Sequence, residues 1–220
     1  MNKKRLIFSK KGTAAYISHL DLMRTFQRAF IRAEMPVWHT EGFNPHAYVA
    51  IALPMPVAHE SDCEILDFGF LDGVEAENVV ERMNAALPEG ITVTACYGDG
   101  RALKHIKYVE NEITLEYDRG VPENALSAMR ELFSHSGIVV SKKGKKGSVK
   151  DVDIAPLIRE IGFSEGEGRI HIRAVLEAMD PYLNPVYVTA AIEKYLPEYA
   201  PDFATYYRRR VLDANMEEFR

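Results

Sequence analysis

The chain contains few cysteines, and their scarcity excludes two kinds of metal site. Only Cys63 and Cys96 occur among the 220 residues, far apart and in no paired motif. The run Cys-x-x-x-Cys-x-x-Cys is absent, so the chain cannot by itself hold the iron–sulfur cluster that such a run binds. A four-cysteine zinc site is excluded too. We therefore expect both thiols to be reduced packing residues.

Long apolar runs and a surplus of positive charge are missing as well. No apolar run approaches the roughly 18 residues that a membrane helix needs. The apolar stretch after the basic N-terminus is three residues long, too short for a signal-peptide core. The formal net charge of −5 argues against a surface coated in positive charge for non-specific nucleic-acid binding. We expect a cytoplasmic protein without membrane association.

The charges are nevertheless unevenly distributed along the chain. Acidic residues dominate 62–81 and 110–131. The basic clusters fall at 3–11, 24–32, 101–107, 142–150 and 208–210. Local basic surfaces are therefore expected on a chain that is acidic overall.

Hydrophobic periodicity predicts the same order of elements in both halves of the chain. In the first half, strands and helices are expected at 5–8, 19–33, 48–53, 63–71, 75–87 and 91–97, with an extended piece at 14–17 and a strand edge at 37–40. In the second half, strands are expected at 112–117, 138–141, 152–163, 169–176 and 205–212, and helices at 123–134 and 184–195.

This order is strand, helix, strand, strand, helix, strand, which is the split ferredoxin-like arrangement. We predict an α+β fold of two tandem ferredoxin-like (βαββαβ) modules with antiparallel sheets. The first module covers residues 1–100 and the second covers residues 101–220.

The predicted helix over 19–33 is amphipathic. Ser18 is its expected N-cap, and Asp21 in the first turn favours the positive end of the helix. Its apolar face is formed by Leu20, Met23, Phe26, Phe30 and Ala33.

Arg24, Arg28 and Arg32 recur every four residues on another face of this helix, where they repel one another. A bound anion, such as RNA phosphate, would relieve the repulsion, because guanidinium groups match phosphate and carboxylate oxygens. An acidic side chain of the fold, such as Glu34 or Glu41, would do the same. Plain exposure to solvent is the third explanation of the stripe.

Titratable and polar residues gather at both ends of this helix, and several chemistries suit them. The catalytic candidates are His19, Asp21, Glu41 and His46, with Asn44 as a further ligand-binding candidate. Acid–base catalysis, metal binding and anion binding are all chemically available to such residues. None of them has diagnostic spacing, so no metal ligands are assigned. Helix capping and a turn over 42–45 would also explain the cluster.

The segment 142–150 contains five lysines and two glycines and cannot bury much apolar surface. It suits contact with a phosphate backbone without reading sequence. The predicted contacts are Lys142, Lys143, Lys145 and Lys146. A solvated hairpin tip is the alternative, and the segment lacks the pattern of a phosphate-binding P-loop.

Two motifs carry a family resemblance: Ser18-His19-Leu20-Asp21-Leu22 and Glu41-Gly42-Phe43-Asn44-Pro45-His46. Phe8-x-Lys10-x-Gly12, Leu53-Pro54 and Lys150-Asp151-Val152-Asp153 add to them. Over most of the chain, and most strongly over 5–67, the sequence resembles the radical-SAM-linked family of uncharacterised bacterial proteins. The run 55–59 departs from the leucine, proline and glycine run expected there.

Members of that family are encoded beside, or fused to, a radical SAM protein. The resemblance therefore implies a partner of a radical SAM enzyme, with RNA as one substrate class. The iron–sulfur cluster and S-adenosylmethionine would belong to the partner chain, and no cofactor is expected in this one. The resemblance carries no catalytic roles with it.

Our leading hypothesis is an accessory subunit that binds RNA or another anionic substrate and presents it to a radical SAM enzyme. Two alternatives stay open. One is a stand-alone enzyme that uses His19 or His46 for acid–base chemistry, oriented by Asp21 or Glu41, on RNA or with a metal. The other is a protein–protein interaction module with no ligand of its own.

Overall fold

The computed structural model describes residues 1–98, 100–143 and 149–220, and it divides into two compact units. The first unit is Met1–His105 with Arg220, and the second is Ile106–Phe219. Within the described residues, four α-helices accompany strands that pair antiparallel. The predicted α+β class is confirmed.

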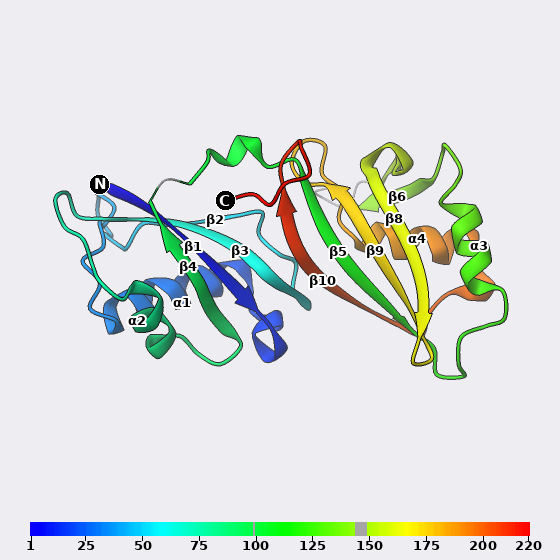
Figure 1. Cartoon of the computed structure of the whole chain (residues 1–220), viewed down its shortest axis with the longest axis horizontal. Coiled ribbons are helices and arrows are strands. Elements are labelled where there is room, and N and C mark those ends of the chain that lie inside the picture. Colours follow the sequence, from blue (N-terminus) through cyan, green and yellow to red (C-terminus); the bar gives the residue numbers. More distant parts are fainter. Residues whose placement is uncertain (99, 144–148) are drawn as a thin grey trace. The chain divides into compact units, whose positions relative to one another are not determined.

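The first unit is built around one antiparallel sheet (Figure 1). Its elements are β1 (Asn2–Lys10), α1 (His19–Arg32), β2 (Val49–Ala52), β3 (His59–Phe70), α2 (Val79–Ala86) and β4 (Ile91–Tyr97), with short 3₁₀ turns η1 (Gly12–Tyr16) and η2 (Leu103–His105). β1 pairs with β4 and β3, while β2 pairs with the same stretch of β3 as β1 does. The strand order within the unit is therefore β4-β1-β3-β2.

Aromatic side chains form the core between α1 and this sheet. The rings of Phe8 and Phe26 lie 4.7 Å apart, and those of Phe30 and Phe68 lie 4.8 Å apart. All four are fully buried. Because side chains alternate along a strand, the residues between the core positions of β1 and β3 face the opposite side of the sheet.

Three details of the first unit differ from the sequence prediction. The extended piece expected at 14–17 is part of η1, because the N–H groups of Ala14 and Ile17 turn back to the carbonyls of Lys11 and Ala14. Leu20, expected on the apolar face of α1, is exposed. The helix expected from 75 begins at Val79, after Asn78 in a left-handed conformation.

Four strands of the second unit pair antiparallel in the order β10-β5-β9-β8. Its elements are β5 (Tyr108–Glu116), α3 (Ala125–Leu132), β6 (Val139–Lys143), β7 (Val149–Asp153), β8 (Ile158–Gly166), β9 (Arg169–Glu177), α4 (Val186–Tyr195) and β10 (Phe203–Leu212). Two 3₁₀ turns, η4 (Ala155–Leu157) and η5 (Pro197–Tyr199), complete it. β6 and β7 form a separate hairpin.

One strand of the second unit was predicted wrongly. The single strand expected at 152–163 is divided into β7 and β8 by η4. Pro156 lies in this turn and has no N–H to donate to a sheet. Asp153 Oδ1 accepts hydrogen bonds from the N–H groups of Ile138 and Ala155, which fixes the chain direction at the break.

Both helices of the second unit contact its sheet, and α4 lies behind the sheet in Figure 1. The Tyr206 hydroxyl on β10 donates a hydrogen bond to Thr189 on α4 (3.0 Å), and Arg130 on α3 donates one to the Phe163 carbonyl on β8 (2.9 Å). The face of the sheet turned away from α4 is called the open face below.

Membrane-spanning helices were searched for among the described residues. None of the helices found there combines the length and apolar character needed to cross a bilayer.

Two arginines tie α1 and α2 to each other through their C-terminal ends. Arg32 on α1 donates to the Ala86 carbonyl at the end of α2 through Nε (3.2 Å) and Nη2 (2.6 Å). Arg82 on α2 donates through Nη2 to the Ala33 (2.6 Å) and Glu34 (3.0 Å) carbonyls just past α1. Each cation lies at the negative end of the other helix, where unsatisfied carbonyls favour it.

We expect the substitution Arg82→Ala to lower the free energy of unfolding by about 1.5 kcal/mol, because it removes charged hydrogen bonds to two helix-end carbonyls. The measurement is urea denaturation followed by circular dichroism. Arg28→Ala is the matched control: its side chain is exposed and makes no hydrogen bond or ion pair within the described residues, so a change below about 0.5 kcal/mol is expected. Equal stability of the two variants would show that the reciprocal contact contributes nothing.

Candidate functional site

The N-terminus of α1 is capped as the sequence predicted. The Asp21 N–H donates to Ser18 Oγ (3.2 Å), and Ser18 Oγ donates to Asp21 Oδ2 (2.7 Å). Asp21 Oδ1 also lies 3.4 Å from Arg24 Nη1, as an exposed ion pair. The Asp21 carboxylate is therefore engaged in helix capping.

His46 and Asn44 lie in the exposed turn that follows α1. His46 Nδ1 lies 3.0 Å from the Asn44 carbonyl and 3.2 Å from Thr40 Oγ1. The Thr40 N–H donates to the His46 carbonyl (2.8 Å), and His39 bridges to Ala47, so the turn is closed at its base. The ring of His46 thus has a fixed direction.

The four catalytic candidates are all exposed: His19, Asp21, Glu41 and His46. Within the described residues, no hydrogen bond or ion pair joins either residue of α1 to either residue of the turn. Nor does the described part of the chain hold a group of three or more His, Cys, Asp or Glu residues arranged to bind a metal ion. An acid–base role for these four residues stays a prediction.

The three arginines of α1 have three different environments. Arg32 is bound to the end of α2, as described above. Arg24 has the weak ion pair with Asp21. Arg28 is exposed and has no hydrogen bond or ion pair within the described residues. The stripe is therefore partly structural, and Arg24 with Arg28 is the part that an external anion can contact.

The β6–β7 hairpin pairs two lysines and places one of them against two tyrosines. Lys142 and Lys150 are direct partners across the hairpin, so their side chains share one face, where like charges repel. The Lys142 ammonium lies 5.9 Å from the ring centroid of Tyr182 and 5.7 Å from that of Tyr187, within cation–π range. Lys145, Lys146 and the side chain of Lys143, all predicted contacts, lie outside the described residues.

Sequence reasoning did not identify Tyr182 and Tyr187. Both are half-buried, Tyr182 in the loop before α4 and Tyr187 in its first turn. They lie more than thirty residues from Lys142 along the chain, so only the fold brings them to the hairpin.

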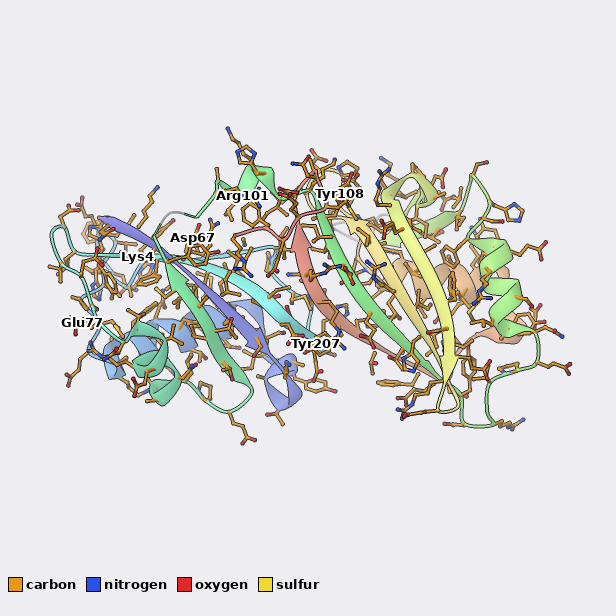
Figure 2. The ribbon with its side chains drawn as sticks, viewed as in Figure 1. Lys4, Asp67, Glu77, Arg101, Tyr108 and Tyr207 are labelled. Carbon is orange, nitrogen blue, oxygen red and sulfur yellow. The ribbon has the colours of Figure 1, made fainter. Side chains whose placement is uncertain are left out.

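A compact ion pair in the first unit holds the chain that leaves β4. Arg5, which is 5% exposed, donates from Nε and Nη2 to the two carboxylate oxygens of Asp67 (2.7 and 3.0 Å) and from Nη1 to the Arg101 carbonyl (2.8 Å). Asp67 and Arg101 are labelled in Figure 2. The hydrogen bond to Asp67 raises the pKa of Arg5. A cavity of about 230 Å³ lies beside this pair.

Gly100 fits closely against the same guanidinium. A Cβ at this position would come within 2.8 Å of Arg5 Nη1. Because the guanidinium is already held by Asp67 and Arg101, it has little room to move, which explains the use of glycine. We assign this pair a structural role.

A groove of about 900 Å³ lies on the open face of the second unit. Its charged lining residues are Glu110, Glu112, Arg173, Arg209 and Arg210. Sequence reasoning did not identify these five residues. Charged residues alternate along β5 and β9, which is the pattern of a strand with one exposed face and could have indicated them.

Glu110 is the central acceptor of this groove. Arg173 donates to it from Nε (2.8 Å) and Nη2 (3.2 Å), and Arg210 donates from Nε (2.9 Å) and from Nη2 through a short contact. Burial of Glu110 would raise its pKa, but the hydrogen bonds and charges of the two arginines outweigh burial and lower it. Glu110 therefore stays ionised and fixes both guanidinium groups.

The matching family model covers residues 3–185 of the chain, so the chain belongs to DUF2344, a family described as an uncharacterised protein conserved in bacteria. Both motifs around α1 and the β6–β7 hairpin fall inside the matched range. No curated protein sequence matches the chain.

We expect Glu110→Gln to destabilise the protein near neutral pH, because two guanidinium groups lose their anion. Since the pKa of Glu110 is lowered by folding, its stabilising effect is present above the ordinary value of 4.5 and is lost as the pH falls through the folded pKa. The free energies of unfolding of the wild type and of Glu110→Gln should differ most at neutral pH and converge below pH 4.5. Urea denaturation across this pH range measures the difference. Glu123→Gln, at an exposed position, is the control: its free energy of unfolding should not show this pH-dependent difference from the wild type.

Proposed function

We propose that this protein is a substrate-binding partner of a radical SAM enzyme and that its substrate is RNA. The radical SAM part rests on the sequence resemblance carried by the motifs at 18–22 and 41–46. The RNA part rests on two basic surfaces, one in each unit. In this proposal the iron–sulfur cluster and S-adenosylmethionine belong to the partner, and the complex acts in the cytoplasm.

One observation carries the RNA proposal: Lys142, the cross-strand partner of Lys150, lies beside Tyr182 and Tyr187. Proteins that bind single-stranded nucleic acid combine positive charge along the backbone with aromatic rings on which bases stack. Here two lysines share one face of a hairpin, and the ammonium of one of them lies over both rings. A phosphate between the lysines would also relieve the repulsion of their charges.

The first unit contributes Arg24 and Arg28. Both project from an exposed face of α1, and Arg28 has no acidic partner within the described residues. The Cβ atoms of residues four apart on a helix lie about 6 Å from each other, comparable to the distance between successive phosphates of a strand. We infer that this surface contacts the RNA backbone without reading bases.

We further infer that each unit is a ferredoxin-like module. In this fold the four strands follow the sheet order 4-1-3-2, and each unit has the corresponding order, β4-β1-β3-β2 and β10-β5-β9-β8. In the second unit the β6–β7 hairpin is then an insertion between the first helix and the second strand. This position leaves the hairpin available for a ligand without disturbing the sheet.

Binding of single-stranded RNA by the full chain should fall steeply with salt. Arg24→Ala/Arg28→Ala should weaken binding and lower the slope of log K against log salt by about 1.4, because two phosphate contacts are lost. Fluorescence anisotropy of a labelled RNA measures both quantities. Arg119→Ala/Arg159→Ala removes the same charge at exposed positions elsewhere and is the matched control.

Variants of the hairpin separate charge from stacking in the same assay. Lys142→Ala/Lys150→Ala should again lower the salt slope. Tyr187→Ala should weaken binding at every salt concentration by about fivefold or more with the slope unchanged, whereas Tyr187→Phe keeps the ring and should bind normally. Absence of binding at low salt, or test variants that all bind as well as the control variant, would overturn the RNA proposal.

The partnership itself is tested by co-expression with the radical SAM protein encoded beside a family member. We expect the two chains to copurify as a stable complex after treatment with ribonuclease. Copurification without any RNA affinity would favour a pure protein–protein module. Separation of the chains at micromolar concentration would contradict the partnership.

A further inference from the structure

The groove on the open face of the second unit is not part of either basic surface described above. It is about 900 Å³ in volume, within the range of pockets that hold small organic ligands. Its lining combines three arginines and His171 with two glutamates. Counted over the arginines and glutamates, the lining carries one net positive charge, so the groove suits an anionic ligand.

The arginines of this groove are already fixed in direction. In all three, a glutamate engages the edge formed by Nε and Nη2: Glu110 for Arg173 and Arg210, and Glu112 for Arg209. Glu110 is 7% exposed, so its carboxylate stays in place on the sheet when a ligand binds or leaves. Guanidinium groups held this way lose little further side-chain entropy when an anion binds.

Two of these guanidinium groups keep donors for a ligand. Arg210 Nη1 has no hydrogen bond within the described residues, and Arg173 Nη1 has only a long contact (3.3 Å) with the half-exposed Glu160. The guanidinium N–H groups match the oxygens of a phosphate. Arg173 and Arg210 can therefore contact one phosphate without giving up Glu110.

Arg209 offers a different surface to a ligand. Its guanidinium carbon lies 4.1 Å from the ring centroid of Tyr207, which is labelled in Figure 2, so the guanidinium group lies over the ring. The Arg209 side chain is 43% exposed. An arginine plane supported on one side by an aromatic ring is a stacking surface for a nucleobase. Glu112 beside it can accept a hydrogen bond from an amino group of a base.

The floor of the groove is open because small residues line it. Gly162 and Ser164 on β8 lie opposite Arg173 and His171 on β9. A Cβ added at Gly162 would meet nothing within 4 Å. The position of Gly162 therefore leaves space next to Arg173 that no side chain of its own fills.

We propose that this groove binds a nucleoside monophosphate, with Arg173 and Arg210 on the phosphate and the Arg209 guanidinium stacked on the base. The nucleotide is either free or the 5′-terminal nucleotide of an RNA. The proposal does not depend on the RNA-binding function above, because it uses different residues.

Isothermal titration calorimetry of the full chain with AMP, GMP, CMP and UMP tests the proposal, with adenosine and inorganic phosphate as partial ligands. At least one nucleotide should bind about tenfold or more tightly than either partial ligand, because phosphate and base contacts combine. A 5′-phosphorylated dinucleotide that binds more tightly than the nucleotide assigns the site to an RNA end. Weaker or equal binding of the dinucleotide assigns it to a free nucleotide.

Variants separate the two halves of the site. Arg209→Ala should weaken nucleotide binding about fivefold or more while leaving inorganic phosphate unaffected. Arg210→Lys, which keeps the charge but loses the planar group, should weaken both ligands. Arg169→Ala is the control, since Arg169 pairs with Glu116 on the same strands outside the groove. Thermal melting confirms that each variant is folded.

Three results would overturn the proposal. They are failure of all four nucleotides to bind in the millimolar range, equal binding of adenosine and a nucleotide, and unchanged binding in both Arg209→Ala and Arg210→Lys.

Discussion

The alternation of side chains along the strands decides where the charged groups of this protein can lie. In each unit one face of the sheet is buried against helices, so every second residue of a central strand must be apolar. The residues between them face the other way and are free to be polar. Arg5 and Asp67 on the first sheet, and Glu110 and Arg173 on the second, occupy such positions. In the first unit, the burial of Phe8 and Phe68 thus leaves Arg5 and Asp67 on the opposite face of the sheet.

Residues of one chemical type have separate roles here because their neighbours differ. Arg32 and Arg28 lie one helical turn apart, yet Arg32 binds the end of α2 and Arg28 faces solvent. Arg173 and Arg210 are held by one ionised glutamate. Charge counting along the chain cannot separate these cases, because a guanidinium that satisfies helix carbonyls or a buried carboxylate is not equally available to a ligand.

The proposed functions follow from the neighbours that the fold gives to its basic side chains. On α1 and on the β6–β7 hairpin, cations lie beside other cations, an arrangement that a polyanion stabilises. On the open face of the second unit, cations lie beside carboxylates that orient them, an arrangement better suited to one defined phosphate. A net-acidic chain can thus present basic surfaces locally.

The sequence by itself determined the α+β class, the order of the main elements, the Ser18 cap and membership of an uncharacterised bacterial family. These depend on local periodicity, on capping chemistry and on motifs that are contiguous in the chain. It did not determine that η4 would divide a strand or that α2 would begin at Val79, since turn geometry outweighed apolar pattern there. Nor did it find Tyr182 and Tyr187 beside Lys142, or Arg209 and Arg210 beside Glu110. Those contacts join residues about 40 to 100 positions apart, and only the pairing of strands and the packing of α4 decided them.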